Sequence, residues 1–170
     1  MSPTMQFIDL RDDPWHAPAG ADAPGHTPSD VRAEAHLLLD PPIWRALRQR
    51  WPAELPVGLK LANDADPRNL AADLARFAVV ELHFPKWVDG RAYSQAHLLR
   101  ERYGYTGRIR ATGDVVVDMM PLLQRCGVDA VVLREGQRQT SAERALGFFP
   151  MGHYQGDVLQ PQPKFAREVA

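Results

Sequence analysis

Basic side chains recur at alternate positions of short apolar segments in the middle of this 170-residue chain. Side chains at alternate positions of a β-strand share one face of the sheet. If the apolar segments are strands, one face collects four cations, one carboxylate and one imidazole. These residues are Lys60, Arg108, Arg110, Arg134, Glu81 and His83. Because guanidinium and ammonium groups bind oxyanions, this face predicts a site for sulfate, sulfite, phosphate or a carboxylate.

Two other interpretations of the same face stay open. Glu81 could pair with Arg108 or Arg110 in an ion-pair network that fills the concavity without binding a ligand. Alternatively, the face could form the interface of a dimer. All three interpretations require the charges to be paired or hydrated, because an unpaired buried charge is costly.

The loops that follow the predicted strands supply further candidate residues. Ligands of parallel α/β folds bind where the strands end at their carboxyl termini. Lys86 and Arg91 lie in one such loop, around the turn dipeptide Asp89-Gly90, and could hold an anion. In the next loop, Gly113 would let the backbone approach a ligand, and Asp114 could accept a proton. Purely structural roles in a turn or a helix cap are the alternative for these residues.

His83 is the other candidate for proton transfer, because imidazole acts as a general acid or base. A packed or hydrogen-bonded histidine is the alternative for this position. Cys126 is the single cysteine, which excludes an internal disulfide, a CxxC pair and a multi-cysteine metal site within one chain. The sequence therefore indicates no metal site. It also lacks the glycine-rich phosphate-binding motifs, the HExxH motif and the GxSxG motif.

The elements that must position these residues alternate between strand and helix. The pattern predicts strands at 57–62, 78–84, 108–112 and 130–134. Asp66 is expected to cap the first intervening helix, and Pro121 to lie in the first turn of the third. Thr140 and Glu143 predict a capping box before the last helix. A fifth, weaker unit is predicted from a strand at 35–39 and a helix at 41–51.

Repeated βα units predict an α/β fold with a parallel sheet of four to five strands. Each strand is apolar on one face only, so helices are expected to cover one face. We therefore predict an arrangement like half of a (βα)8 barrel. An open, flavodoxin-like sheet is the alternative.

The rest of the chain is rich in proline and poor in apolar periodicity. We predict a flexible Pro/Ala-rich arm at 1–34, a single α/β domain at 35–149, and an extended C-terminal tail at 150–170. The net charge of −1 and the absence of a long apolar run or signal pattern argue against nucleic-acid binding, membrane insertion and secretion. A cytoplasmic location is therefore expected.

Four stretches resemble a known bacterial family. They are 84–94 (FPKWVDGRAYS), 98–102 (LLRER), 110–115 (RATGDV) and 125–130 (RCGVDA). The resemblance spans about 78–133 and is to uncharacterised proteins, typically encoded beside assimilatory sulfite reductase and often labelled "oxidoreductase probably involved in sulfite reduction". The sequence departs from that family's pattern at Val128 and Val131, where aromatic residues are usual, and at Met119, where glutamine is common.

The resemblance implies a role in sulfur assimilation. The expected function is an accessory factor that binds a small oxyanion, with His83 or Asp114 moving a proton if a reaction occurs. The alternative is a non-catalytic module that docks sulfite reductase or a second copy of itself. Whether the chain is an enzyme stays open, because the oxidoreductase label comes without a nicotinamide, flavin, haem or cluster motif that would identify a cofactor.

Overall fold

A computed structural model describes residues 5–19, 27, 30–149 and 153–162 of the chain. Its centre is a six-stranded sheet, in which every pair of neighbouring strands is parallel. In spatial order the strands are β1 (Gln6–Phe7), β6 (Ala130–Val131), β5 (Arg108–Gly113), β4 (Phe77–Phe84), β3 (Val57–Leu61) and β2 (Leu37–Leu39). The prediction of an α/β fold with a parallel sheet is confirmed, with one strand more than expected.

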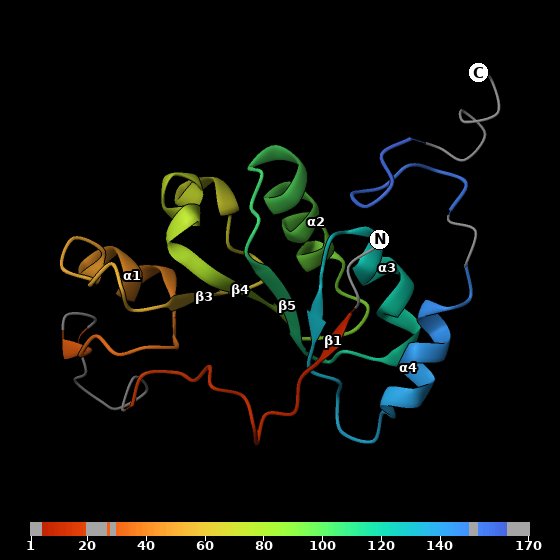
Figure 1. The fold of residues 1–170 in the computed structure, drawn as a ribbon, viewed down its shortest axis with the longest axis horizontal. Helices are drawn as coiled ribbons and strands as arrows, with labels where there is room; N and C mark the ends of the chain where they lie inside the picture. The colour runs from red at the N-terminus through yellow and green to blue at the C-terminus, as the bar shows by residue number, and fades with distance from the viewer. Residues whose placement is uncertain (1–4, 20–26, 28–29, 150–152, 163–170) are drawn as a thin grey trace.

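The helices lie on one side of this sheet (Figure 1). They are α1 (Pro41–Leu47), the 3₁₀ helix η2 (Pro67–Arg76), α2 (Arg91–His97), the π-helix η3 (Leu98–Arg102), the 3₁₀ turn η4 (Val117–Met119), α3 (Met120–Arg125) and α4 (Gln139–Leu146). From β2 to β6 each strand is added beside the preceding one, always in the same direction. Right-handed crossovers then place every connecting helix on the same face. A flavodoxin-like sheet would need a reversal within the series from β2 to β6, and this series contains none.

The helix-covered face of the sheet forms the hydrophobic core. Leu59, Leu82, Ile109 and Val131 point into it and are fully buried. The alternation breaks at the start of β4, where the pairing register with β3 shifts between Val57 and Gly58. This irregularity puts Phe77 in the core, and Ala78 is therefore exposed. Strict alternation had placed Ala78 on the apolar face.

Local signals position most of the helices. The Asp66 side chain caps η2 by accepting a hydrogen bond from the Arg68 N–H, and α3 begins with Pro121 in its first turn, as predicted. The predicted capping box before α4 is wrong, because the helix begins at Gln139 with Arg138 as its N-cap, so that Thr140 lies inside the helix. The Gln139 side chain instead bonds to Glu143 at 2.8 Å. The helix predicted after Gly90 continues past α2 as a π-helical turn.

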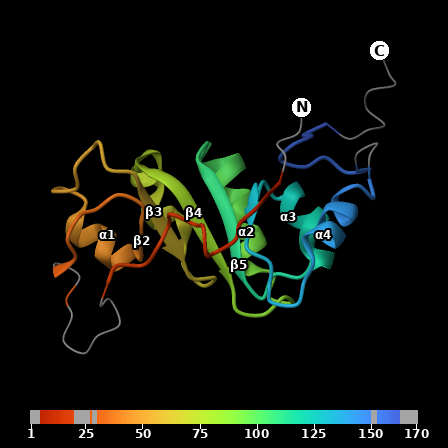
Figure 2. The ribbon, with the colours of Figure 1, turned by 60° about the horizontal axis from the view of Figure 1, so that its bottom comes forward.

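The opposite face of the sheet is crossed by residues 5–16, here called the N-terminal strap. The strap begins as β1 at one edge of the sheet and ends at His16, which bridges Leu37 of β2 at the other edge. Figure 2 shows this segment, in red, passing in front of the sheet. The strap belongs to the predicted arm at 1–34, and its residues contact both edges of the sheet. Residues 1–4, 20–26 and 28–29 lie outside the described residues.

Part of the predicted tail also packs on the body. Asp157 pairs with Arg125 at 3.3 Å, and the Val158 N–H donates to the Arg125 carbonyl at the end of α3. The rest of the predicted tail, residues 150–152 and 163–170, is not described. In the part of the chain that the structure describes, no helix has the length and apolarity needed to cross a bilayer.

Candidate functional site

The sheet face that the helices leave bare carries the predicted polar side chains and is here called the open face. Lys60, Glu81 and Arg110 lie side by side on it, because these residues are register partners on β3, β4 and β5. His83 and Thr112 form the next pair toward the carboxyl ends of the strands. The structure thus brings Lys60, His83 and Arg110 onto one face, as alternation predicted.

Arg110 is not free to hold a ligand, although the sequence made it a central anion-binding candidate. Its side chain is 2% exposed and donates to Glu81 through Nε at 2.8 Å and Nη2 at 2.6 Å. Its remaining nitrogen, Nη1, pairs with Asp13 of the N-terminal strap. Of the sequence interpretations, the ion-pair network therefore describes this residue, with a second carboxylate added from outside the predicted domain.

The N-terminal strap complements the open face in charge and in shape. It holds three aspartates and one arginine, whereas the strands beneath it carry an excess of cations. Trp15 lies over β3, where a Cβ at position 58 would come within 3.0 Å of its indole ring. Glycine at this position therefore makes room for the ring.

Asp114 joins three loops at the carboxyl end of the sheet. Its carboxylate accepts from the Trp87 N–H at 2.9 Å and from Arg134 Nη1 at 2.7 Å, and its own N–H donates to the Phe84 carbonyl. The Trp87 N–H and the Arg134 guanidinium together lower the pKa of Asp114 below its ordinary value. A carboxylate held ionised in this way suits positioning better than the proton transfer predicted for it. Arg134, an anion-binding candidate, is paired and half-exposed.

Asp89 and Arg91 pair with each other at the start of α2. Arg91 donates to Asp89 at 2.7 Å through Nη2, and Asn63 donates to the same carboxylate at 2.6 Å. The bonds from the Arg91 side chain and N–H lower the pKa of Asp89 to about 2. Gly90 is the N-cap of α2 at a φ of −77°, which other residues also adopt. This group is a helix-start anchor rather than part of the open face.

Three of the predicted cations have no hydrogen-bonding or ion-pair partner among the described residues. Lys60 is half-buried on the open face, and Lys86 is exposed in the loop after β4. Arg108 is exposed at the opposite, amino end of β5, where it lines a pocket beneath the strap. The structure therefore separates Arg108 from the carboxyl-end candidates.

Thr112 and His83 form the least satisfied polar pair on the open face. The Thr112 side-chain oxygen is buried and has no hydrogen-bond partner among the described residues, and the residue as a whole is 9% exposed. His83, its half-buried register partner, lies against Gly113, where an added Cβ would come within 2.8 Å of the imidazole ring. Gly113 thus permits close approach of the β4 end rather than of a ligand. A hydroxyl and an imidazole side by side can both donate to one anion.

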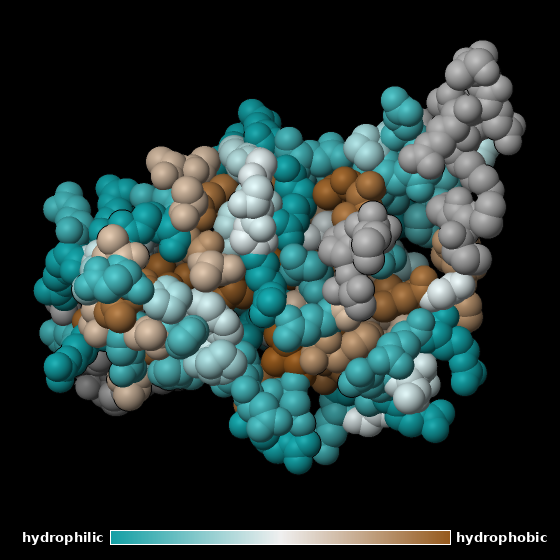
Figure 3. Space-filling view, viewed as in Figure 1, coloured by the Kyte–Doolittle hydropathy of each residue, from teal (hydrophilic) through white to brown (hydrophobic). Residues whose placement is uncertain are grey.

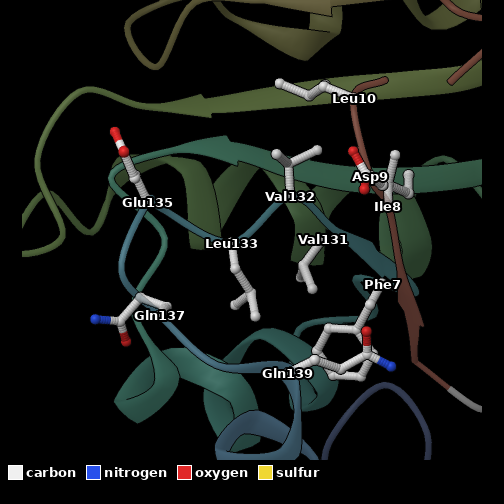
Figure 4. A pocket seen from close by; sticks show the side chains of 10 residues that line it. All are labelled: Phe7, Ile8, Asp9, Leu10, Val131, Val132, Leu133, Glu135, Gln137 and Gln139. Carbon is white, nitrogen blue, oxygen red and sulfur yellow. The ribbon is translucent and has the colours of Figure 1, made fainter. Parts of the chain in front are cut away.

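A pocket of about 460 Å³ lies where β1 and β6 end. In Figure 4 the side chains of Phe7, Val131 and Leu133 converge on it, whereas Glu135 points away from it. Hydrophobic residues also gather around β1 on the molecular surface (Figure 3). Leu10, at the rim, is 63% exposed. The lining lacks a cation, so this pocket suits an apolar group better than an anion.

The remaining reactive side chains sit in structural settings. Burial raises the pKa of the Cys126 thiol, and burial raises the pKa of Tyr93 to about 12. A thiol that stays protonated is a poor nucleophile. Within the described ranges, no three histidine, cysteine, aspartate or glutamate side chains gather closely enough to hold a metal ion.

Sequence reasoning missed the contacts of two residues, Asp13 of the strap and Thr112 of the open face. Asp13 was part of the predicted arm, and its pairing with a residue 97 positions away leaves no local pattern. Thr112 was placed on the correct face by alternation, but only the structure reveals that its hydroxyl lacks a partner. The acidic composition of the strap could have indicated that this segment packs on the sheet, because an acidic segment complements a cationic face.

Comparison with protein families places these features in a family context. The bacterial proteins of unknown function grouped as DUF934 match residues 58–165, which include β4 to β6 and all of β3 except Val57. The chain therefore belongs to this family. No curated protein matches it.

Proposed function

We propose that this protein is an accessory factor of sulfur assimilation that binds a small oxyanion at the carboxyl end of its parallel sheet. The observation that carries the proposal is the buried Thr112 hydroxyl without a partner, next to His83. A buried hydroxyl that makes no hydrogen bond costs free energy, and a ligand oxygen that accepts from it would recover that cost.

The charge around this pair supports an anion as the ligand. Lys60 and Lys86 have no ion-pair partner among the residues that the structure describes, and Arg134 is half-exposed beside Asp114. The proposed site excludes Arg110 and Arg91, because both are paired with carboxylates. It also excludes Arg108, which lies at the amino end of β5. We assign hydrogen bonding to Thr112 and His83, and long-range attraction to the lysines.

Sulfite or sulfate is the proposed ligand, rather than oxyanions in general, because of the resemblance to proteins encoded beside sulfite reductase. Sulfite presents three oxygens on one sulfur, which suits a hydroxyl donor and an imidazole donor on one side and a cation on the other. His83 is the residue we propose to move a proton if the ligand reacts. Asp114 positions the Trp87 loop and Arg134.

The test replaces the hydroxyl without changing the shape of the side chain. In Thr112→Val, the unliganded protein should melt at the same or a slightly higher temperature, because an unsatisfied buried hydroxyl is removed. The thermal shift that sulfite, sulfate or phosphate produces in the wild type should be lost. Ligand at about 100 times its dissociation constant stabilises by about 2.7 kcal/mol, which is easily resolved.

Thr106→Val, at an exposed threonine, is the matched control and should keep the full anion response. A wild type that shows no shift with any oxyanion beyond that with chloride, or a Thr112→Val protein that responds like the wild type, would contradict the proposal.

The apolar pocket beside β1 favours a second candidate function, docking of sulfite reductase or of a second copy. Its rim residue Leu10 is exposed, and β1 is a two-residue edge strand whose outer side pairs with no other strand of the described residues. Leu10→Asp should then abolish a dimer, or a complex with sulfite reductase, in size-exclusion chromatography. A wild type that stays monomeric alone and with sulfite reductase would rule this candidate out.

A further inference from the structure

The strap residue Asp13 is held as a ligand would be held. Its two carboxylate oxygens have different donors: Oδ2 pairs with Arg110 Nη1, and Oδ1 accepts from the Trp15 N–H at 3.2 Å. The Asp13 side chain is 3% exposed, and the Arg110 side chain is 2% exposed. The Trp15 N–H lies two residues along the strap itself, so the bond that joins Asp13 to the sheet is the one from Arg110, a guanidinium donor of the kind by which proteins bind carboxylates.

Glu81 fixes the guanidinium that makes this site. It occupies Nε and Nη2 of Arg110, so that Nη1 is the nitrogen left to face the strap. The guanidinium is thus oriented by the sheet alone, since Glu81 and Arg110 are register partners on β4 and β5. Asp13 is added from a different part of the chain, and the receptor for its carboxylate belongs to the open face.

We infer that the open face carries a carboxylate-binding site at Arg110, and that the N-terminal strap is its built-in ligand. The ligand class is a small monocarboxylate or an acidic side chain presented in the same way. Any such ligand must replace Asp13, so the strap is an autoinhibitory cover of this site. The inference is independent of the oxyanion site proposed at Thr112 and His83, because it uses neither residue.

Access to the site exists beside the strap. A pocket of about 280 Å³ is lined by Asp13, Trp15 and Arg108, among others. Formate or acetate is far smaller than this space, so once the Asp13 carboxylate is removed by mutation a small acid can enter from this pocket and reach the vacated position while the strap stays in place. Arg108 is exposed, makes no hydrogen bond or ion pair through its side chain among the described residues, and lines the same pocket, where its charge favours the entry of an anion.

The test removes the Asp13 carboxylate and supplies another. Asp13→Ala leaves Arg110 facing an empty space and should lower the melting temperature by about 6–20 °C, because one partner of a buried ion pair is lost. Sodium formate should restore a large part of this loss, and acetate a smaller part because of its methyl group. Sodium chloride at the same ionic strength should restore none of it.

Two variants serve as controls. Asp12→Ala removes a neighbouring aspartate that is exposed, and should respond to formate only as the wild type does. Asp13→Asn keeps the shape of the side chain and should show little formate response, because the amide fills the space. If Asp13→Ala is unfolded in buffer, the same titration is followed as the far-UV circular dichroism regained with formate.

The outcomes separate the possibilities. A formate response confined to Asp13→Ala supports the carboxylate site. An equal response in Asp13→Ala and Asp12→Ala, or no gain with formate over chloride, overturns it. Restoration by sulfate as large as that by formate overturns the assignment to carboxylates, since sulfate is tetrahedral. None of these results depends on Thr112, so the oxyanion proposal stands or fails separately.

Discussion

Gly113 allows the end of β5 to lie against the end of β4. Its φ is +92°, and a Cβ at this position would come within 2.3 Å of the Phe84 carbonyl oxygen. Glycine is therefore favoured at this position for two separate reasons, the left-handed conformation and the close approach of the Phe84 backbone. The same turn places the Asp114 N–H on the Phe84 carbonyl, so the geometry of the candidate site depends on it.

We expect Gly113→Ala to lower the free energy of unfolding by about 3 kcal/mol, the combined effect of a disfavoured φ and steric overlap. Gly136→Ala is the matched control, because its φ is +81° but a Cβ there meets nothing within 4 Å. It should cost only about 1 kcal/mol. Urea denaturation measures both. Equal losses in the two variants would show that the close approach to β4 has no energetic weight.

At the residue scale, the sequence predicted which side chains share the open face but not which are already paired. Alternation along a strand is a local property and placed Lys60, Arg110 and His83 correctly. The partner of each charge depends on residues brought close by the fold. Asp114 illustrates this, since its two strongest partners come from loops 27 and 20 residues away.

Among the elements, the π-helix η3 is held by one side chain. Arg100 donates to the carbonyls of Gly127 at 2.9 Å, Tyr105 at 2.5 Å and Gly107 at 2.7 Å, and to the Asp129 carboxylate at 2.9 Å. The side chain is 14% exposed. It thus ties the end of the helix to the loops before β5 and β6.

We expect Arg100→Met to lower the free energy of unfolding by about 3 kcal/mol or more, because three carbonyls and a half-buried carboxylate lose their donor. Arg102→Met, at an exposed arginine of the same helix, should change it by less than about 0.5 kcal/mol. Chemical denaturation at neutral pH measures the difference. A loss below about 1 kcal/mol in Arg100→Met would mean that water replaces the arginine without cost.

The order of the elements was predictable, whereas their kind and exact ends were less so. Each apolar stripe and each proline or glycine boundary is encoded within a few residues, which is why the βα order from β2 to β6 was correct. The 3₁₀ form of η2, the π-helical turn and the two-residue length of β6 depend on packing against neighbouring elements. Local propensity does not determine these features.

For the whole molecule, the sheet should be most stable at its centre. β4 and β5 each have a hydrogen-bonded neighbour on both sides and share the longest register in the sheet. β1 has two residues and one neighbour. In hydrogen exchange followed by mass spectrometry, we expect the amides of β4 and β5 to exchange slowest and those of the strap to exchange by local opening. Equal protection of β1 and β4 would contradict this order.

The strap was the main feature of the molecule that the sequence did not predict. Its residues lack apolar periodicity, which indicated a loose arm, yet it is fixed by two edge pairings, the Asp13–Arg110 pair and the fit of Trp15 over Gly58. All four contacts are made with residues distant in sequence. The composition of a segment indicates how much apolar surface it can bury by itself. It does not indicate which partners a distant part of the chain places beside it.

Asp13 and Arg110 are 97 residues apart, and this separation sets an order of events during translation. At ribosomal rates of 5–20 residues per second, roughly 5 to 20 s pass between the synthesis of the two residues. The segment made first is therefore among the last to reach its place, since it must wait for both sheet edges. Throughout that interval the nascent chain carries the Asp13 carboxylate without the arginine that later pairs with it.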